Sequence, residues 1–98
     1  MSMKVLLEVQ LRPGVGAEGE NAIRETLAQT AAFPGNEALE VLVDDADPNR
    51  VVVVETWAAA SDHDAYVAWR ATPEGAAALA TVIAAPPVTR TFGRAIAL

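Results

Sequence analysis

The chain has 98 residues, of which 52% are hydrophobic, and a net charge of −6, which corresponds to one domain over residues 1–98 with ample material for a core. It contains no cysteine, which excludes disulfides and thiolate chemistry, and no cluster of basic residues, so nucleic acid is not an expected partner. The apolar runs are too short to span a bilayer and the N-terminus lacks a signal-peptide pattern, so we expect a cytoplasmic protein with no membrane partner.

Residues 3–11 are predicted to form a strand because apolar side chains recur at every second position. One face of this strand would carry Val5, Leu7, Val9 and Leu11. Residues 17–32 have the period of a helix, which Pro34-Gly35 ends. The stripe that this helix buries is predicted to consist of Ile23, Leu27, Thr30 and Ala31.

The middle of the chain is predicted to form a hairpin. Residues 37–43 alternate as a half-buried strand, and residues 44–49 are rich in Asp, Pro and Asn, which favour a turn. The run Val51–Val54 follows, and its β-branched residues favour a second strand that ends at Trp57. Because this strand is apolar on both faces, both must be covered. The chain's own helices can cover one face, and a second copy of the chain is the simplest cover for the other.

The last third is predicted to contain a second helix and a final strand. Ser61 is a suitable N-cap with Asp64 three residues later, and the helix would run to about Ala71. A further helical stretch is predicted at 76–83 and a strand at 88–92. The order β-α-β-β-α-β predicts an α+β, ferredoxin-like fold, which is an antiparallel sheet with both helices on one face.

Several short motifs occur in a fixed order over residues 4–92. They are Pro13-Gly14, Thr30, Pro34-Gly35, Asp47-Pro48 and Glu55-Thr56-Trp57. With these motifs the chain resembles the antibiotic biosynthesis monooxygenase family. The resemblance implies a homodimer that pairs its sheet faces into a dimeric α+β barrel. It also implies a cofactor-independent monooxygenase that acts on a small aromatic or quinol-like compound in an apolar pocket between helices and sheet.

The motifs are specific for the fold rather than for a reaction, so two other functions stay open. One is an isomerase of a small carbonyl metabolite, and the other is a non-catalytic dimer that binds a small ligand. The chain also departs from relatives, which often carry a histidine where Tyr66 stands, whereas its single histidine is His63. No histidine follows Trp57 at the spacing of an axial haem ligand. With no ligand cluster and no Gly-rich dinucleotide fingerprint, we expect no metal, haem, flavin or nicotinamide cofactor.

A cofactor-free oxygenase needs a dry apolar pocket, a group that handles the substrate proton, and a donor or cation for the developing negative charge. The candidate catalytic residues are Tyr66, His63 and Arg90, and the candidate substrate-binding residues are Trp57, Trp69 and Arg70. Most have a structural alternative: core packing for Trp57, packing or the dimer surface for Trp69, surface exposure for His63 and a solvated helix-end charge for Arg70. For Arg90 the alternatives are a place in the pocket or in a salt bridge of the dimer, and exposure to solvent. If Arg90 faced the helices, its buried charge would need a partner, for which Glu55 is the internal candidate.

Overall fold

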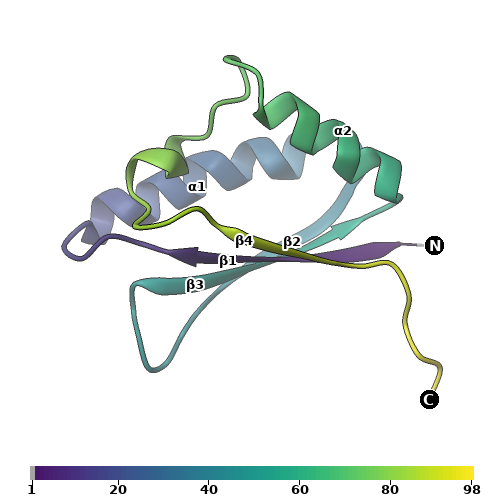
Figure 1. Cartoon of the computed structure of the whole chain (residues 1–98), viewed down its shortest axis with the longest axis horizontal. Helices are drawn as coiled ribbons and strands as arrows, with labels where there is room; N and C mark the ends of the chain where they lie inside the picture. Colours follow the sequence, from purple (N-terminus) through teal and green to yellow (C-terminus); the bar gives the residue numbers. More distant parts are fainter. Residues whose placement is uncertain (1) are drawn as a thin grey trace.

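The computed structural model describes residues 2–98 and has the predicted order of elements (Figure 1). One antiparallel sheet has the order β2-β3-β1-β4 and is built from β1 (Met3–Gln10), β2 (Asn36–Val43), β3 (Arg50–Trp57) and β4 (Val88–Phe92). One face of this sheet is covered by α1 (Gly16–Ala32), α2 (Ala60–Arg70) and the short 3-10 helix η1 (Ala78–Thr81). The predicted α+β ferredoxin-like fold is confirmed.

The sheet has a covered face, which lies under the helices, and an open face on its other side (Figure 1). The valine run shows the difference, because Val51 and Val53 are 3% and 1% exposed while Val52 and Val54 are half-buried. Val53 pairs with Leu7 of β1 and with Val41 of β2, so these three share the covered face. The prediction that the chain's own helices cover one side of the valine strand is confirmed.

The core on the covered face has two parts. The larger lies between α1, η1 and the sheet and is built around Val9, Leu11, Ile23, Val51, Leu79 and Val82. The smaller lies under α2 and consists of Met3, Val5, Trp57 and Tyr66, with Phe33 and Trp69 packed against it. The aliphatic side chains therefore gather at one end of the covered face, and the aromatic ones at the other.

Three local predictions are wrong. Ala31 is exposed, and Thr26 lies in the buried stripe of α1 in its place. The helix α2 begins at Ala60 after Ala59 as N-cap, without a side-chain cap bond, so Ser61 lies inside the helix. In place of a helix at 76–83, only the 3-10 turn η1 forms.

The chain after α2 leaves the helical path because local hydrogen bonds end α2 and a bond to β1 holds the chain further on. The Thr72 hydroxyl donates to the carbonyl of Trp69 and accepts from the Gly75 N–H, which makes it the end of α2 rather than the start of another helix. Further on, the Ala84 N–H donates to the Gln10 carbonyl. This hydrogen bond holds the chain against the end of β1 before it enters β4. Among residues 2–98, no helix combines the length and the hydrophobicity that a bilayer span requires.

Candidate functional site

A group of polar and ring-bearing side chains meets at the end of the covered face under α2. It consists of Glu55, Trp57, His63, Tyr66 and Arg70, which we name the α2 cluster. Trp57 is the last residue of β3 and is fully buried. The ring centroids of His63 and Tyr66 lie 5.6 Å and 5.1 Å from that of Trp57. Residues three apart on a helix share one face, so α2 presents both rings to the strand.

His63 is buried, so the alternative that places it on the surface is wrong. Trp69 is half-buried against Phe33, with ring centroids 5.6 Å apart. A packing role and a role in the functional site therefore do not exclude each other for the ring-bearing residues of α2. They are packing residues that surround buried polar groups.

The Tyr66 hydroxyl is held from two sides. It lies 2.7 Å from the Thr30 hydroxyl of α1, and Arg70 Nε donates to it at 2.8 Å. Arg70 also donates through Nη2 to the Thr26 carbonyl at 2.8 Å, and its guanidinium stacks over the Trp69 ring at 4.8 Å. Arg70 is thus not a solvated charge at a helix end. It is a cation fixed between two helices, next to a phenol.

Glu55 is the residue of the cluster for which the sequence suggested only a structural role. It is 3% exposed, and Trp57 Nε1 donates to its Oε1 at 2.8 Å. Burial raises the pKa of the Glu55 carboxyl, and the Trp57 hydrogen bond and the charges of His63 and Arg70 oppose that rise in part. Its position in the sequence carries a clue. It lies at even spacing from the buried Val51 and Val53, so strand alternation predicts that its carboxyl lies on the same apolar face.

Asn36 is a second polar residue that the sequence did not single out. It pairs with Trp57 across β2 and β3, and its side-chain Nδ2 is buried without an acceptor among residues 2–98. A buried donor without a partner is uncommon in folded proteins and calls for an explanation such as a bound water or ligand atom.

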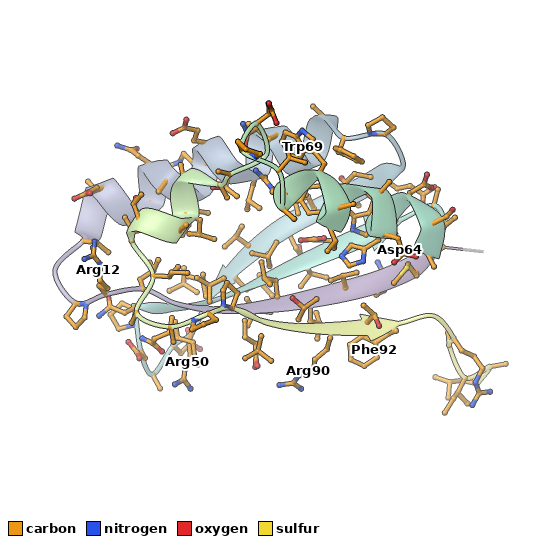
Figure 2. All side chains as sticks on the ribbon, turned by 45° about the horizontal axis from the view of Figure 1, so that its top comes forward. Arg12, Arg50, Asp64, Trp69, Arg90 and Phe92 are labelled. Carbon is orange, nitrogen blue, oxygen red and sulfur yellow. The ribbon has the colours of Figure 1, made fainter. Side chains whose placement is uncertain are left out.

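Arg90 is not brought to this cluster. It pairs with Leu6 of β1 on the open face, its side chain is 56% exposed, and it forms an ion pair with Glu8 at 2.8 Å. Figure 2 shows Arg90 and Phe92 pointing away from the helices. The condition under which Arg90 would pair with Glu55 is therefore not met, because the two residues lie on opposite faces of the sheet. The reason is the register of β4 on β1.

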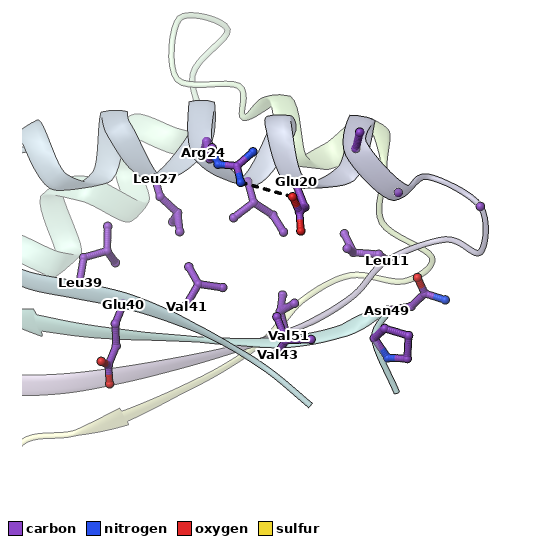
Figure 3. Close-up of a pocket in the computed structure, with 15 residues that line it drawn as sticks. Leu11, Glu20, Arg24, Leu27, Leu39, Glu40, Val41, Val43, Asn49 and Val51 are labelled. Atoms are coloured by element: carbon purple, nitrogen blue, oxygen red, sulfur yellow. Dashed lines mark hydrogen bonds and ion pairs between the residues drawn. The ribbon is translucent and has the colours of Figure 1, made fainter. Parts of the chain in front are cut away.

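A cavity of about 980 Å³ lies between α1 and the strands β2 and β3 (Figure 3). Its lining is mainly apolar and includes the aliphatic residues Leu11, Ile23, Leu27, Leu39, Val41 and Val51. This volume is at the upper end of the range for small-molecule sites, and such sites are mostly apolar with a few polar groups. None of the six site residues predicted from the sequence lines this cavity.

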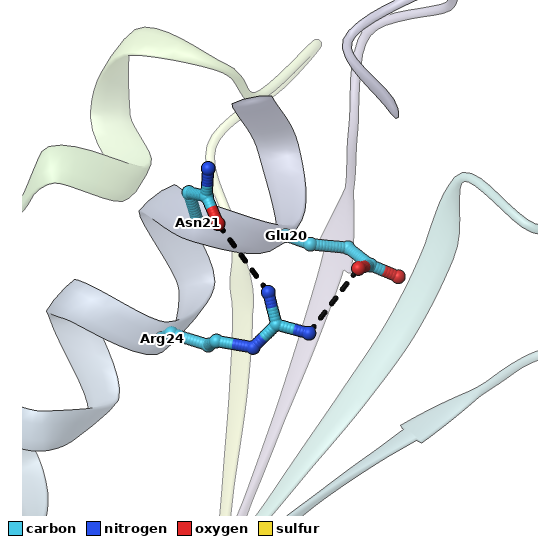
Figure 4. Close-up of polar contacts among 3 residues, drawn as sticks. All are labelled: Glu20, Asn21 and Arg24. Carbon is cyan, nitrogen blue, oxygen red and sulfur yellow. Dashed lines mark hydrogen bonds and ion pairs between the residues drawn. The ribbon is translucent and has the colours of Figure 1, made fainter. Parts of the chain in front are cut away.

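The polar groups on the α1 side of the cavity are Glu20 and Arg24 (Figure 4). Arg24 donates to Glu20 and to Asn21 at 3.3 Å each, and the side chains of the ion pair are 70% and 66% exposed. Exposed pairs of this kind contribute about 0–1 kcal/mol. Arg24 is therefore free to exchange these partners for a ligand.

The cavity and the α2 cluster adjoin each other through the sheet. Leu39 lines the cavity and is the direct cross-strand neighbour of Glu55. On the covered face of β3 the side chains follow in the order Val51, Val53, Glu55 and Trp57, and Val51 also lines the cavity. The cavity thus extends to Leu39, one cross-strand step from the buried carboxyl of Glu55, which does not itself line it. Among residues 2–98, no three His, Asp or Glu side chains come together as a metal site would require.

The structure resembles several solved structures. SnoaB, a cofactor-independent oxygenase from Streptomyces nogalater, has a TM-score of 0.80 at 20% identity, with 99% of this chain and 96% of that chain covered. A conserved protein from Methanosarcina mazei Go1 has a TM-score of 0.78 at 14% identity, with 94% and 91% covered. Rv0793 from Mycobacterium tuberculosis has a TM-score of 0.77 at 13% identity, with 99% and 98% covered. At these identities the likeness concerns the fold.

The sequence itself is matched by a family model. That model describes antibiotic biosynthesis monooxygenases and matches residues 2–81, which is most of the chain and includes the cavity and the α2 cluster. No curated protein is similar enough in sequence to count as a match. The resemblance inferred from the short motifs is confirmed: the chain belongs to the antibiotic biosynthesis monooxygenase family.

Proposed function

We propose that this protein is a cofactor-independent monooxygenase that oxidises a small aromatic or quinol-like compound between the helices and the sheet. One observation carries the proposal: an aliphatic cavity large enough for such a compound adjoins a buried cluster of side chains that can handle protons and negative charge. The family to which the chain belongs supports it, as does the fold shared with SnoaB, a cofactor-independent oxygenase.

The cluster provides the chemical groups that the reaction needs. An electron-rich substrate loses its hydroxyl proton and passes an electron to dioxygen, so negative charge develops in a dry environment. We assign proton handling to Tyr66 and His63, and stabilisation of the oxyanion to Arg70. Arg90 is not proposed to stabilise the oxyanion, because it lies on the open face. Trp57 and Trp69 hold these groups in place.

We also propose that the active form is a homodimer joined through the open faces of two sheets. Large apolar side chains are exposed there, with Leu42 at 52%, Val88 at 53% and Phe92 at 47%. Exposed apolar surface of this kind, interspersed with charged groups such as Glu8 and Arg90, is typical of an interface. Pairing of two open faces would complete the α+β barrel that the family resemblance implies.

Oxygen uptake with 1,4-naphthohydroquinone tests the proposed reaction. We expect uptake above spontaneous oxidation, and we expect Leu39→Trp to reduce it strongly because the larger ring fills the cavity next to Glu55. Val67→Trp is the matched control, since Val67 is 51% exposed on α2 and should leave uptake unchanged. No uptake by the wild-type protein, or equal uptake by the Leu39 variant, would contradict the proposal.

Non-catalytic binding of a small ligand is a second candidate, favoured by one observation. The Tyr66 hydroxyl already has two partners, Thr30 and Arg70, and Tyr66 does not line the cavity. A protein that binds naphthol-like compounds without consuming oxygen in the presence of a hydroquinone would have this function.

A further inference from the structure

We propose that Glu55 is the proton acceptor for a hydroxylated ligand bound in the cavity between α1 and β2. The inference rests on the proposed use of this cavity as the substrate site, and it names the group that acts first on the substrate. It revises the assignment of proton handling to Tyr66 and His63 made above: Glu55 takes the substrate proton, and those two side chains would hydrogen-bond the resulting anion.

The position of Glu55 is the first argument. It stands directly opposite Leu39, which lines the cavity, and both side chains lie on the covered face. Directly opposed side chains in an antiparallel pair have Cβ atoms about 4.5–5.5 Å apart. Glu55 does not itself line the cavity, whose ionisable lining groups are Glu20, Arg24 and Glu40. It is the carboxyl on the covered face that lies one cross-strand step behind Leu39.

The hydrogen bonding of Glu55 is the second argument. Trp57 Nε1 holds Oε1 at 2.8 Å, and no other group among residues 2–98 donates to the carboxyl. A carboxylate accepts several hydrogen bonds when it is ionised, so Oε2 retains its full accepting capacity. Tyr66 is less available, since its hydroxyl is engaged by Thr30 and by Arg70.

The surroundings of Glu55 favour a stronger base than an exposed carboxylate would be. Burial between Val5 of β1 and Leu39 of β2 raises the pKa of its carboxyl, and a raised pKa makes the ionised form a stronger base. The charged groups that face it come from α2, where His63 and Arg70 favour the carboxylate. The same two groups would stabilise a substrate anion next to it.

The step itself is a simple proton transfer. The O–H bond of the bound phenol or quinol breaks, its proton forms a bond with Glu55 Oε2, and the electron pair stays on the substrate oxygen. A phenolate and a carboxylic acid result, with no change in total charge. Dioxygen enters only afterwards, as the oxidant of the anion.

Binding of 1-naphthol tests this role without any turnover. This probe has one hydroxyl and stays un-ionised over roughly pH 4 to 8, because a phenol has a pKa near about 10. Affinity would be followed by tryptophan fluorescence and calorimetry. We expect it to rise about tenfold as Glu55 ionises, since a hydrogen bond to a charged acceptor is stronger than one to a neutral group by about 1 kcal/mol or more.

Three variants and one matched ligand separate this role from a structural one. Glu55→Gln should bind 1-naphthol with no pH dependence, whereas Glu55→Asp keeps the carboxyl and should keep the dependence. Trp57→Phe removes the donor to Oε1 and should move the rise in affinity to higher pH, because that hydrogen bond lowers the Glu55 pKa. Binding of 1-methoxynaphthalene, which lacks the hydroxyl proton, should be independent of pH in every protein.

The inference is overturned if the wild-type protein fails to bind 1-naphthol, or if its pH dependence persists in Glu55→Gln. It stands if the dependence disappears in that variant alone, even when no hydroquinone is oxidised. In that case the proposed oxygenase reaction fails while the role of Glu55 as proton acceptor remains. If hydroquinones are oxidised with equal pH profiles by wild type and Glu55→Gln, the reaction stands and the role of Glu55 is wrong.

Discussion

At the scale of single residues, the contact between Tyr66, Thr30 and Arg70 joins the two helices above the sheet. The phenol belongs to α2 and the threonine hydroxyl to α1, while Arg70 donates to Tyr66 and to the Thr26 carbonyl of α1. Thr30 is fully buried, so this contact lies out of reach of solvent. Polar groups that satisfy one another inside a protein are costly to separate, and they fix the geometry of the rings around them.

We predict that Tyr66→Phe lowers the turnover of any oxidised hydroquinone by about ten- to a thousandfold, because it removes one hydrogen-bonding group at the reacting centre. It should also lower the free energy of unfolding by about 1–3 kcal/mol, because Arg70 Nε loses its buried acceptor. Kinetics and urea unfolding measure the two effects. Thr30→Val is the control: it should cost stability and leave the phenol and most of the turnover in place. Equal losses of turnover in both variants would contradict a chemical role for Tyr66.

At the scale of elements, the segment after α2 decides where the aliphatic part of the core closes. Gly75 lies against the last turn of α2, where an added Cβ would overlap the carbonyl of Trp69. Its own carbonyl accepts a hydrogen bond from Arg70 Nη1 at 3.3 Å. This close approach lets η1 reach α1, where the Leu79 N–H donates to the Thr26 hydroxyl at 3.0 Å.

Gly75→Ala is therefore expected to destabilise the protein by about 1–3 kcal/mol, because the backbone of one segment must move away from α2. Urea unfolding followed by circular dichroism measures the change. Gly93 is the matched control, since an added Cβ there meets nothing within 4 Å, and Gly93→Ala should change stability by less than about 0.5 kcal/mol. Equal stabilities of the two variants would show that the segment after α2 moves freely.

At the scale of the whole molecule, the two faces of the sheet have different tasks. The covered face holds the core, the cavity and the α2 cluster, while the open face exposes apolar side chains beside the pair of Glu8 and Arg90. Among residues 2–98, no element covers the open face. The homodimer that we propose would remove this apolar surface from water.

Val54→Asp is predicted to convert a dimer into a folded monomer, because Val54 lies on the open face opposite Leu6 and a buried, unpaired charge would oppose association. Val53→Asp should instead prevent folding, since Val53 is 1% exposed beneath the helices. Sedimentation at micromolar concentration and circular dichroism distinguish the two outcomes. Val67→Asp on the exposed side of α2 serves as the control and should remain dimeric. A wild-type protein that sediments as a monomer would refute the dimer.

The sequence by itself determined the four strands, the two main helices, their order and the family. The bounds of β1, α1, β3 and β4 follow from periodicity and turn residues, which act over a few neighbouring positions. The valine strand, apolar on both faces, likewise predicted that the chain's helices cover one of these faces. Where a boundary depends on a distant partner, prediction failed. The chain around η1 is held by Thr26 and Gln10, and both lie far away in the sequence.

Only the tertiary structure decided which side chains meet. Alternation places Arg90 with Val88 and Phe92, but the register of β4 on β1 puts all three on the open face. The long-range pairing of β2 with β3 likewise places Glu55 opposite Leu39. Leu39 in turn lines the cavity that forms between α1 and these two strands. Periodicity assigns a residue to one of two faces, whereas the packing of helices on the sheet decides which face is dry. The chemistry of a carboxyl depends on that second choice, because burial is what changes its pKa.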